Sequence, residues 1–263
     1  MGRPEGRAGF ESVAAFFAGR RVGHAIRWKE KTVSTMDDAR SGAREGAPEG
    51  LVSGADGQTA GRGRHGRSWL GSSGDDLLVS ILFRPSPASS SQLSMLAGLA
   101  CARTVDRLLP IPSAIKWPND VRVQGRKICG VLVESETSGV QTVSVVGIGL
   151  NVNLDPTRWS EIAESSTSLR QLTGAPHDRV ATLRILLEEI NDLYDRVVAG
   201  ASVRDDWASR VETVGRTVTV TSTGDVVTGR AEGIDYDGSL LVRTADGQLR
   251  RFTAGEVTLQ GAR

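Results

Sequence analysis

The residues best suited to chemistry form one short stretch, Gly61-Arg62-Gly63-Arg64-His65-Gly66-Arg67, which is followed by Ser68-Trp69. Its glycines let the backbone turn and approach a ligand closely. Its arginines carry guanidinium forks that match phosphate and carboxylate groups, and free backbone N–H groups in such a loop bind the same anions. The stretch therefore predicts an anion-binding loop, with a solvated basic turn as the alternative.

Two common nucleotide-binding motifs do not account for this loop. Gly61, Gly63 and Gly66 match G-x-G-x-x-G, but that dinucleotide fingerprint requires a helix that opens at the last glycine. Residues 69–76 show no helical periodicity. The pattern G-x-x-x-x-G-K-[ST] of a Walker-type P-loop does not occur in the chain. We therefore expect an anion site of another kind.

Polar side chains crowd a second stretch, Lys116-Trp117-Pro118-Asn119-Asp120. The proline excludes a helix there, and Asn-Asp favours a turn. Lys127 follows in the turn between two predicted strands, 121–123 and 128–134. It is either an ordinary exposed hairpin charge or a point-charge cation that an apolar strand directs into a dry cleft.

Two further segments offer polar groups. Ser34 and Thr35 begin a predicted helix with acidic residues in its first turn, so they either cap that helix or donate to a small polar ligand at its N-terminus. A predicted strand over 140–147 runs into Gly147-Ile148-Gly149-Leu150-Asn151. Its glycines allow a flat ligand to come close, and Asn151 offers an acceptor and donors to a purine edge.

The elements that must position these residues follow from hydrophobic periodicity. Strands over 51–55 and 77–83 flank the glycine–arginine loop and would present it from a rigid scaffold. Apolar stripes predict two long core helices, one over 93–108 and one from the cap Asp178 to Val197. A shorter helix is predicted over 203–212.

The residue pattern changes from helical to strand-like after Gly215. Alternating Val and Thr, with turn signals at 223–225, 237–238 and 246–247, predict several short strands that form a small barrel. Basic and acidic residues balance over 213–263. An RNA-binding barrel would carry a basic excess, so a lid or docking module fits better.

Composition narrows the class of protein. The chain has 263 residues, 39% hydrophobic and 24% charged, with a formal net charge of +1, which is ordinary for a globular domain and gives no global attraction to nucleic acid or membrane. Cys101 and Cys129 lack C-x-x-C spacing and predict a reduced, buried pair rather than a zinc site. No signal peptide or transmembrane span is visible, so the cytoplasm is expected.

Taken in order, Ser34-Thr35, G-R-G-R-H-G-R, K-W-P-N-D, R-K-I-C-G-V-L-V-E, G-I-G-L-N-V-N and a terminal small barrel resemble the biotin protein ligase family over residues 32–259. The resemblance implies an α/β fold. A mixed-sheet catalytic domain, akin to lipoate ligases and class II aminoacyl-tRNA synthetases, would span 1–212, and an SH3-like β-barrel would span 213–263. Fewer than about 30 residues precede the catalytic pattern, so the chain resembles the short class without an N-terminal DNA-binding domain.

The resemblance implies an ATP-dependent ligase that forms a C–N bond, with ATP and biotin as substrates and Mg²⁺ expected. Biotin carboxylate attacks the α-phosphorus of ATP to give biotinyl-5′-AMP and pyrophosphate, and a lysine of a biotin carboxyl carrier domain then displaces AMP. The implied carriers belong to acetyl- or propionyl-CoA carboxylase. Neither DNA nor a membrane is an expected partner, and both monomer and homodimer remain open.

The resemblance also implies roles for individual residues. Lys127, Arg64 and Asp120 are expected to be catalytic, with Asp120 orienting the incoming lysine amine. Residues expected to hold biotin are Ser34, Thr35, Met36, Gln58, Gly61, Arg62, Gly63, Arg64, Lys127 and Gly130. Residues expected to hold the nucleotide are Arg64, Arg67, Trp69, Lys116, Asn119 and Asn151. No resident metal-ligand set is predicted. Met36 stands where the family often has Asn, which puts one side-chain hydrogen bond in question.

Three other interpretations remain. A lipoate or octanoyl ligase would share the fold and the adenylation chemistry. A biotin- or nucleotide-sensing regulator would bind DNA, and a binding scaffold would hold ligand without releasing pyrophosphate. For the ligase, we expect the glycine–arginine loop to be mobile when empty and to close over the adenylate, which excludes the water that would hydrolyse it.

Overall fold

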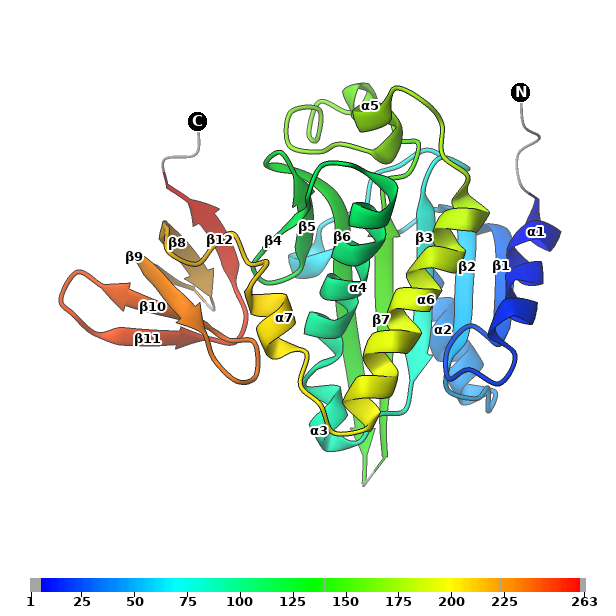
Figure 1. Ribbon diagram of the computed structural model, residues 1–263, viewed down its shortest axis with the longest axis horizontal. Helices are drawn as coiled ribbons and strands as arrows, with labels where there is room; N and C mark the ends of the chain where they lie inside the picture. The colour runs from blue at the N-terminus through cyan, green and yellow to red at the C-terminus, as the bar shows by residue number, and fades with distance from the viewer. Residues whose placement is uncertain (1–5, 140, 223, 261–263) are drawn as a thin grey trace.

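The computed structural model describes residues 6–139, 141–222 and 224–260, and its larger unit is built on a seven-stranded mixed sheet (Figure 1). The strand order is β1-β2-β3-β7-β6-β5-β4. β1 pairs with β2 in parallel, and the other neighbours pair antiparallel. The strands are β1 (Ala25–Thr32), β2 (Leu51–Gln58), β3 (Leu77–Phe83), β4 (Ala114–Lys116), β5 (Asp120–Val123), β6 (Arg126–Ser138) and β7 (Gln141–Leu150). The α/β mixed-sheet fold expected from the sequence is confirmed.

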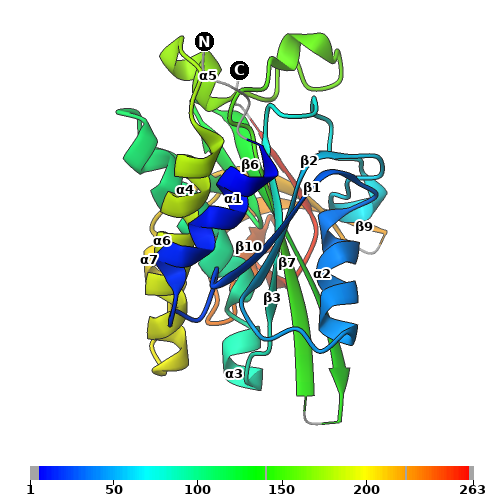
Figure 2. The same ribbon diagram turned by 90° about the vertical axis from the view of Figure 1, so that its right-hand side faces the viewer.

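Helices cover both faces of this sheet (Figure 2). α4 (Leu93–Leu108) and α6 (Arg179–Val198) pack side by side on one face together with α1 (Arg7–Ser12), and α2 (Thr35–Arg44) lies on the other. Because both faces are covered, β3 is buried at every residue, which explains its almost entirely apolar sequence. The bounds predicted for β3 and α4 are confirmed.

Side-chain caps define where helices α2 and α6 begin. The Ser34 hydroxyl accepts a hydrogen bond from the Met36 N–H at 3.3 Å, and the Asp178 carboxylate accepts one from Ala181 N–H at 2.8 Å. Each cap satisfies a backbone donor that has no partner within its helix. The predicted starts of α2 and α6 are therefore confirmed, and α2 begins against the sheet with Thr35 and Met36 buried.

Shorter helices complete this unit. They are η1 (Val13–Phe17), η2 (Arg64–Gly66), α3 (Pro87–Ser90), η3 (Pro156–Arg158), α5 (Leu169–Thr173) and α7 (Arg204–Ala208). The helix predicted over 203–212 stops early because Ile115 N donates to Arg210 O and Glu212 N donates to Ile115 O, so residues 210–212 pair with β4 instead. The strand predicted over 140–147 extends to Leu150, and Val140 lies outside the described residues.

A five-stranded antiparallel sheet forms the smaller C-terminal unit, beside β4 and α7 (Figure 1). Its strands are β8 (Thr217–Ser222), β9 (Asp225–Ile234), β10 (Leu240–Thr244), β11 (Leu249–Phe252) and β12 (Glu256–Leu259), in the order β11-β10-β9-β8-β12. The predicted turns carry glycines with φ of 90°, 87° and 83° at Gly224, Gly238 and Gly247, a conformation that glycine adopts without steric cost; Thr223 lies outside the described residues. Trp117 Nε1 donates to Gly238 O at 2.9 Å and joins the two units.

Cys101 and Cys129 are free and buried, as predicted, and burial raises the pKa of the Cys129 thiol. Among the described helices, none combines the length and apolar character that a membrane crossing requires.

Candidate active site

The glycine–arginine loop joins β2 to β3 as a short hairpin. Gly63 N donates to Arg67 O at 2.7 Å, and Trp69 N donates to Gly61 O at 2.9 Å. The turn between them is η2, in which His65 and Gly66 have φ of 54° and 73°. A non-glycine residue with positive φ is uncommon because this backbone conformation is sterically unfavourable. The hairpin hydrogen bonds on either side hold His65 in it. These hydrogen bonds define a turn from which the three arginines project.

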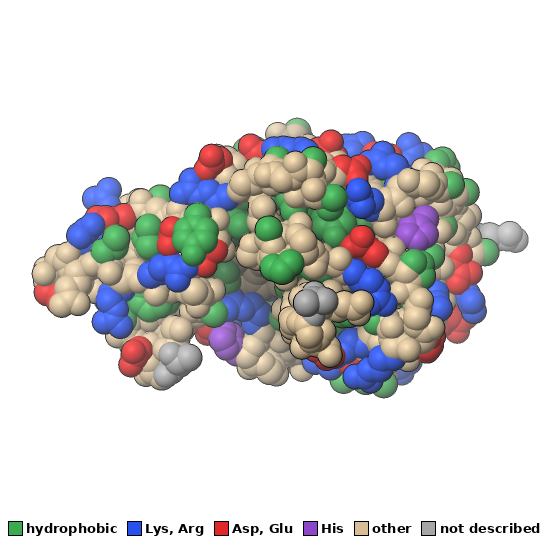
Figure 3. Space-filling model, turned by 90° about the horizontal axis from the view of Figure 1, so that it is seen from below, with side chains coloured by type: hydrophobic (Ala, Val, Ile, Leu, Met, Phe, Trp, Pro, Cys, Tyr) green, Lys and Arg blue, Asp and Glu red, His purple; other side chains and the backbone are tan. Residues whose placement is uncertain are grey.

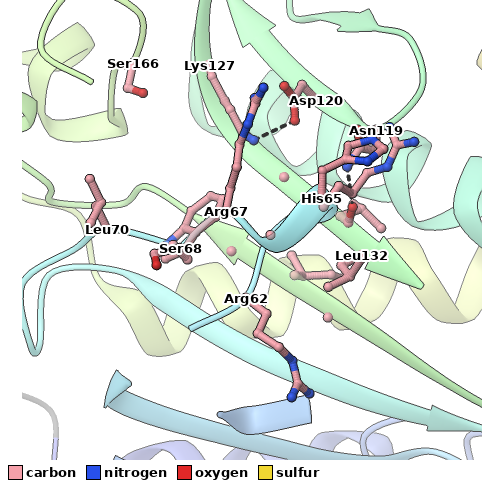
Figure 4. Close-up of a pocket in the computed structure, with 18 of the residues that line it drawn as sticks. Arg62, His65, Arg67, Ser68, Leu70, Asn119, Asp120, Lys127, Leu132 and Ser166 are labelled. Atoms are coloured by element: carbon pink, nitrogen blue, oxygen red, sulfur yellow. Dashed lines mark hydrogen bonds and ion pairs between the residues drawn. The ribbon is translucent and has the colours of Figure 1, made fainter. Parts of the chain in front are cut away.

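The three arginines of the loop reach three different elements. Arg62 pairs with Asp37 of α2 at 2.8 Å and points away from Lys127 (Figure 4). Arg64 donates to Asn119 Oδ1 at 3.3 Å and to the Gly255 carbonyl at 3.2 Å.

Arg67 pairs with Glu256 of β12. The guanidinium groups thus hold the loop between the two units, and Arg64 is the most enclosed of them: burial lowers its pKa against the opposing effect of Asp120.

Lys127 and Asp120 form an ion pair inside the site. Asp120 opens β5 opposite Gly130 of β6, and its Oδ1 lies 2.6 Å from Lys127 Nζ (Figure 4). Asn119 is fixed beside them, since its Nδ2 donates to Val131 O at 2.6 Å. Lys116 lies on the neighbouring β4, where burial lowers the pKa of its ammonium group. Of the two interpretations of Lys127, the structure places it in the cleft rather than on an exposed hairpin.

Two paired glycines make room for the Trp69 indole. Gly130 of β6 lies directly opposite Gly149 of β7. A Cβ atom at Gly149 would lie 2.6 Å from the indole ring, and one at Gly130 would lie 2.9 Å from it. Lys127 Nζ stands 5.3 Å from the ring centroid. We name Gly130 and Gly149 the glycine floor, because any larger residue there would displace the ring.

Thr35 and Gln58 form a second polar end of the site. Gln58 Oε1 accepts from Thr35 N at 2.8 Å, and the Thr35 and Ser80 hydroxyls lie 2.8 Å apart. Met36, next to them, is buried in a small apolar cluster under α2, and its Sδ lies 3.0 Å from the position that a Cβ would have at Gly147. A thioether therefore packs where the family often has an amide.

One cavity of about 660 Å³ joins these groups. Figure 3 shows the molecule hollowed between its two units, with basic side chains and a histidine at the edge. The predicted site residues that line the cavity are Ser34, Thr35, Met36, Gln58, Arg62, Gly63, Arg64, Arg67, Trp69, Lys116, Asn119, Asp120, Lys127, Gly130 and Asn151.

Gly61 is the exception. It is buried behind the wall, with Gln58 Nε2 2.9 Å from the position of a Cβ.

Sequence reasoning missed two segments of the wall. One comprises Glu161, Ile162, Ser165 and Ser166, and the other runs from Gly255 to Thr258 at the start of β12. The segment that contains Ser165 and Ser166 is held by the backbone of Lys127. Lys127 N donates to Ser165 O and Thr167 N donates to Lys127 O, both at 2.8 Å. Their side chains carry no motif, so only the tertiary hydrogen bonds could have revealed them.

The Asn151 side chain already uses its amide nitrogen in a hydrogen bond within the protein. Its Nδ2 donates to Thr167 O at 2.9 Å, while its buried Oδ1 has no hydrogen-bond partner among the described residues. The side-chain atom of Asn151 left unpaired is therefore an acceptor, which suits an exocyclic amine of a purine.

The described residues contain no group of three or more His, Cys, Asp or Glu side chains that could hold a metal ion. Mg²⁺ needs no such group where a nucleotide is bound, because it usually takes one or two carboxylates together with substrate phosphates and water. Asp120 supplies a carboxylate in the cavity wall beside basic side chains suited to phosphates, so the residues present fit a nucleotide-borne Mg²⁺.

Comparison with known proteins identifies the family. The model of the biotin/lipoate A/B protein ligase family matches residues 29–151, and that of the biotin protein ligase C-terminal domain matches residues 213–259. The biotin–[acetyl-CoA-carboxylase] ligase of Mycobacterium tuberculosis is 35% identical over 254 residues, covering 90% of this chain and 91% of that protein. The chain belongs to the biotin protein ligase family.

Two other biotin ligases extend the comparison. The bifunctional ligase/repressor BirA of Bacillus subtilis is 32% identical over 240 residues, which cover 89% of this chain and 74% of that protein. The structure of the Aquifex aeolicus biotin protein ligase in complex with biotin and ATP superposes with a TM-score of 0.75 at 28% identity, over 90% of this chain and 98% of that one. The similarity to the Aquifex aeolicus structure spans both sheets, so the chain shares the architecture of that ligase.

Proposed function

We infer that this chain activates biotin with ATP as biotinyl-5′-AMP, releases pyrophosphate, and transfers biotin to a lysine of a biotin carboxyl carrier domain. The observation that carries this function is the arrangement along β7. Met36 packs on Gly147 and Trp69 packs on Gly149, two residues apart on the same face. Two residues of a strand span about 7 Å, so a ligand at the Thr35 end would directly abut one stacked on the Trp69 ring.

The chemistry demands that two anions meet. A carboxylate must approach the α-phosphorus of a polyphosphate, and cationic donors held in place beforehand stabilise the charge that develops there. Lys127 lies next to the glycine floor and is oriented by Asp120, while Arg64 reaches the same wall from the loop. We assign Lys127 and Arg64 to the bridging and phosphate oxygens, and Asp120 to orienting the lysine amine of the carrier.

The polar end around α2 suits the ureido ring and chain of biotin. Ser34, Thr35 and Gln58 provide hydroxyl and amide groups there, and Met36 and Leu132 provide apolar contact. The fixed Thr35–Gln58 hydrogen bond orients the Gln58 amide before a ligand arrives. We propose that Arg62, Gly63 and Gly130 complete this subsite, and that Gly61 acts from behind it by giving Gln58 room.

The opposite end suits the nucleotide. We assign Trp69 to the base, the Asn151 acceptor to an exocyclic amine, and Arg67, Lys116 and Asn119 to the phosphates. Mg²⁺, where bound, supplies charge neutralisation to the phosphates, and Asp120 would be its carboxylate from this chain.

The relatives named for acetyl-CoA carboxylase suggest the acceptor. We propose the biotin carboxyl carrier domain of acetyl- or propionyl-CoA carboxylase as partner and the cytoplasm as compartment, in keeping with two free cysteines. We further propose that the chain divides into a catalytic domain over 1–212 and an SH3-like domain over 213–263, that it binds no DNA, and that it acts as a monomer or homodimer.

ATP–pyrophosphate exchange tests the activity directly. Exchange should depend on biotin, should not be supported by lipoate or octanoate, and should be followed by labelling of a carrier domain. Exchange that depends on lipoate would instead indicate a lipoate or octanoyl ligase. Biotin binding without exchange would indicate a binding scaffold. A gel shift of the wild-type protein at moderate salt tests for a DNA-binding regulator.

A further inference from the structure

Asp76 is a buried carboxyl that the proposed mechanism does not use. It immediately precedes β3, is 0% exposed, and accepts a hydrogen bond at Oδ1 from the Val152 N–H at 3.2 Å. Val152 follows Asn151, so this bond ties Asp76 to the nucleotide end of the cavity. Its other oxygen, Oδ2, is buried and has no hydrogen-bond partner among the described residues.

A second buried polar atom, also unpaired within the part of the chain that the structure describes, lies close by. It is Trp69 Nε1, the only donor of the indole that covers the glycine floor. Both atoms face Gly71: the position of a Cβ there would lie 2.7 Å from Asp76 Oδ2 and 4.0 Å from Trp69 Nε1. The missing side chain of Gly71 thus leaves a donor and an acceptor facing one shared gap.

Buried polar atoms are nearly always paired, because an unpaired one loses its water without compensation. Asp76 Oδ2 can accept from the indole N–H directly after a small movement of the loop, or through one bridging water, and it keeps a lone pair for this bond whether the carboxyl is ionised or protonated. Either bond would restrain the indole in its own plane, which stacking on two glycines does not do.

We propose that Asp76 is a positioning residue for the nucleotide half of the reaction, and that its carboxyl holds the Trp69 indole N–H across the gap at Gly71 and so fixes the ring on the glycine floor. The proposal rests on the assignment of Trp69 to the nucleotide base. It gives Gly71 a role as well, since any side chain there would separate the two groups.

Asp76→Asn is the sharpest variant. It keeps the volume and an oxygen for the Val152 N–H, but it turns an amide donor toward the indole donor. We expect the KM for ATP in biotin-dependent pyrophosphate exchange to rise roughly 10-fold, the order of one lost hydrogen bond, with little change in biotin affinity by calorimetry. Gly71→Ala, which fills the gap, should reproduce this selective effect.

A double-mutant cycle separates positioning from a general structural role. Trp69→Phe keeps a ring and removes the N–H, so Asp76→Asn should add no further rise in ATP KM in that background. Asp75→Asn, which alters the neighbouring half-buried carboxylate, serves as the matched control. Full multiplicative effects of Asp76→Asn and Trp69→Phe, or equal losses of biotin and ATP affinity, would overturn the proposal. Absence of exchange in the wild-type protein would instead refute the proposed function.

Discussion

Lys127 lies 2.6 Å from Asp120 and 5.3 Å from the centre of the Trp69 ring, at the point where the two proposed subsites meet. Lys127→Ala would remove the cation and leave Asp120 to repel both substrates. Loss of one preorganised donor typically costs on the order of 100- to 1000-fold in rate. We expect that loss in biotin-dependent pyrophosphate exchange, whereas Lys29→Ala, at a surface lysine paired with Asp38, should retain the wild-type rate. Near-wild-type exchange by Lys127→Ala would exclude the assigned role.

Asp76 makes a separate prediction about stability. Burial and the neighbouring Asp75 raise the pKa of its carboxyl to about 8, although the Val152 N–H and Arg179 act in the opposite direction. In the unfolded chain the group titrates near 3.8, so between these values the folded state holds a proton that the unfolded state has lost. The free energy of unfolding must therefore fall as pH rises toward 8. Above about pH 8 the carboxyl is ionised in both states, and the stabilisation from the bound proton is lost.

Asp76→Asn removes that dependence. Between about pH 6 and about pH 8, the wild type should lose on the order of 2 kcal/mol of unfolding free energy that the variant retains. Denaturant titrations at both pH values measure the difference, and Asp225→Asn, at an exposed carboxylate of β9 away from Asp76, provides the control. Parallel pH profiles for wild type and Asp76→Asn would show that the carboxyl does not titrate in this range.

At the scale of elements, the loop between β2 and β3 is the part of the site most able to move. It is a surface hairpin held by exposed or half-exposed ion pairs, Arg62 with Asp37 and Arg67 with Glu256, and such pairs contribute little stability. We expect hydrogen exchange of residues 58–72 to slow when biotin is added and to slow further with ATP, while β11, far from the cavity, stays unchanged. Equal exchange with and without ligand would contradict a loop that closes over the adenylate.

Local patterns predicted most elements correctly. The sequence predicts the bounds of β3 and α4 correctly. A strand buried on both faces is a continuous apolar run, and a helix buried on one face has apolar residues at helical spacing, so each pattern begins and ends with its element. The end of α7 was predicted wrongly, since residues 210–212 pair with Ile115, nearly a hundred positions away. A local sequence pattern does not predict pairing between residues so far apart in the chain.

The cavity wall divides in the same way. Lys127 and Trp69 were expected in the site because the motifs that contain them resemble those of biotin protein ligases. Ser165 and Ser166 are ordinary polar residues that reach the cavity only through backbone bonds to Lys127. The sequence predicted half of the glycine floor: glycines at 147 and 149 suggested a close approach, but the pairing of Gly149 with Gly130 depends on the β6–β7 register.

At the scale of the whole molecule, the two sheets complete one site. Trp117, inside the K-W-P-N-D motif, donates to Gly238 of the smaller unit, and the start of β12 lines the cavity. Valines of β8 pack into the same hydrophobic core as α4. The balanced charge of residues 213–263 predicted a lid or docking module, and the position of β12 against the cavity agrees with a lid.

The contact between these units makes the last prediction. Glu256 of β12 pairs with Arg67 of the loop, and both side chains are substantially exposed. A polyphosphate entering the cavity competes with this carboxylate for Arg67 and is repelled by it. Glu256→Gln should therefore lower the KM for ATP about threefold, in line with an exposed ion pair, and the gain should shrink at high salt. The same substitution in an Arg67→Ala background should have a much smaller effect, because the competition is gone. A raised KM in Glu256→Gln would mean that the pair instead holds the loop in its ATP-binding position, and that the smaller unit assists binding rather than restraining it.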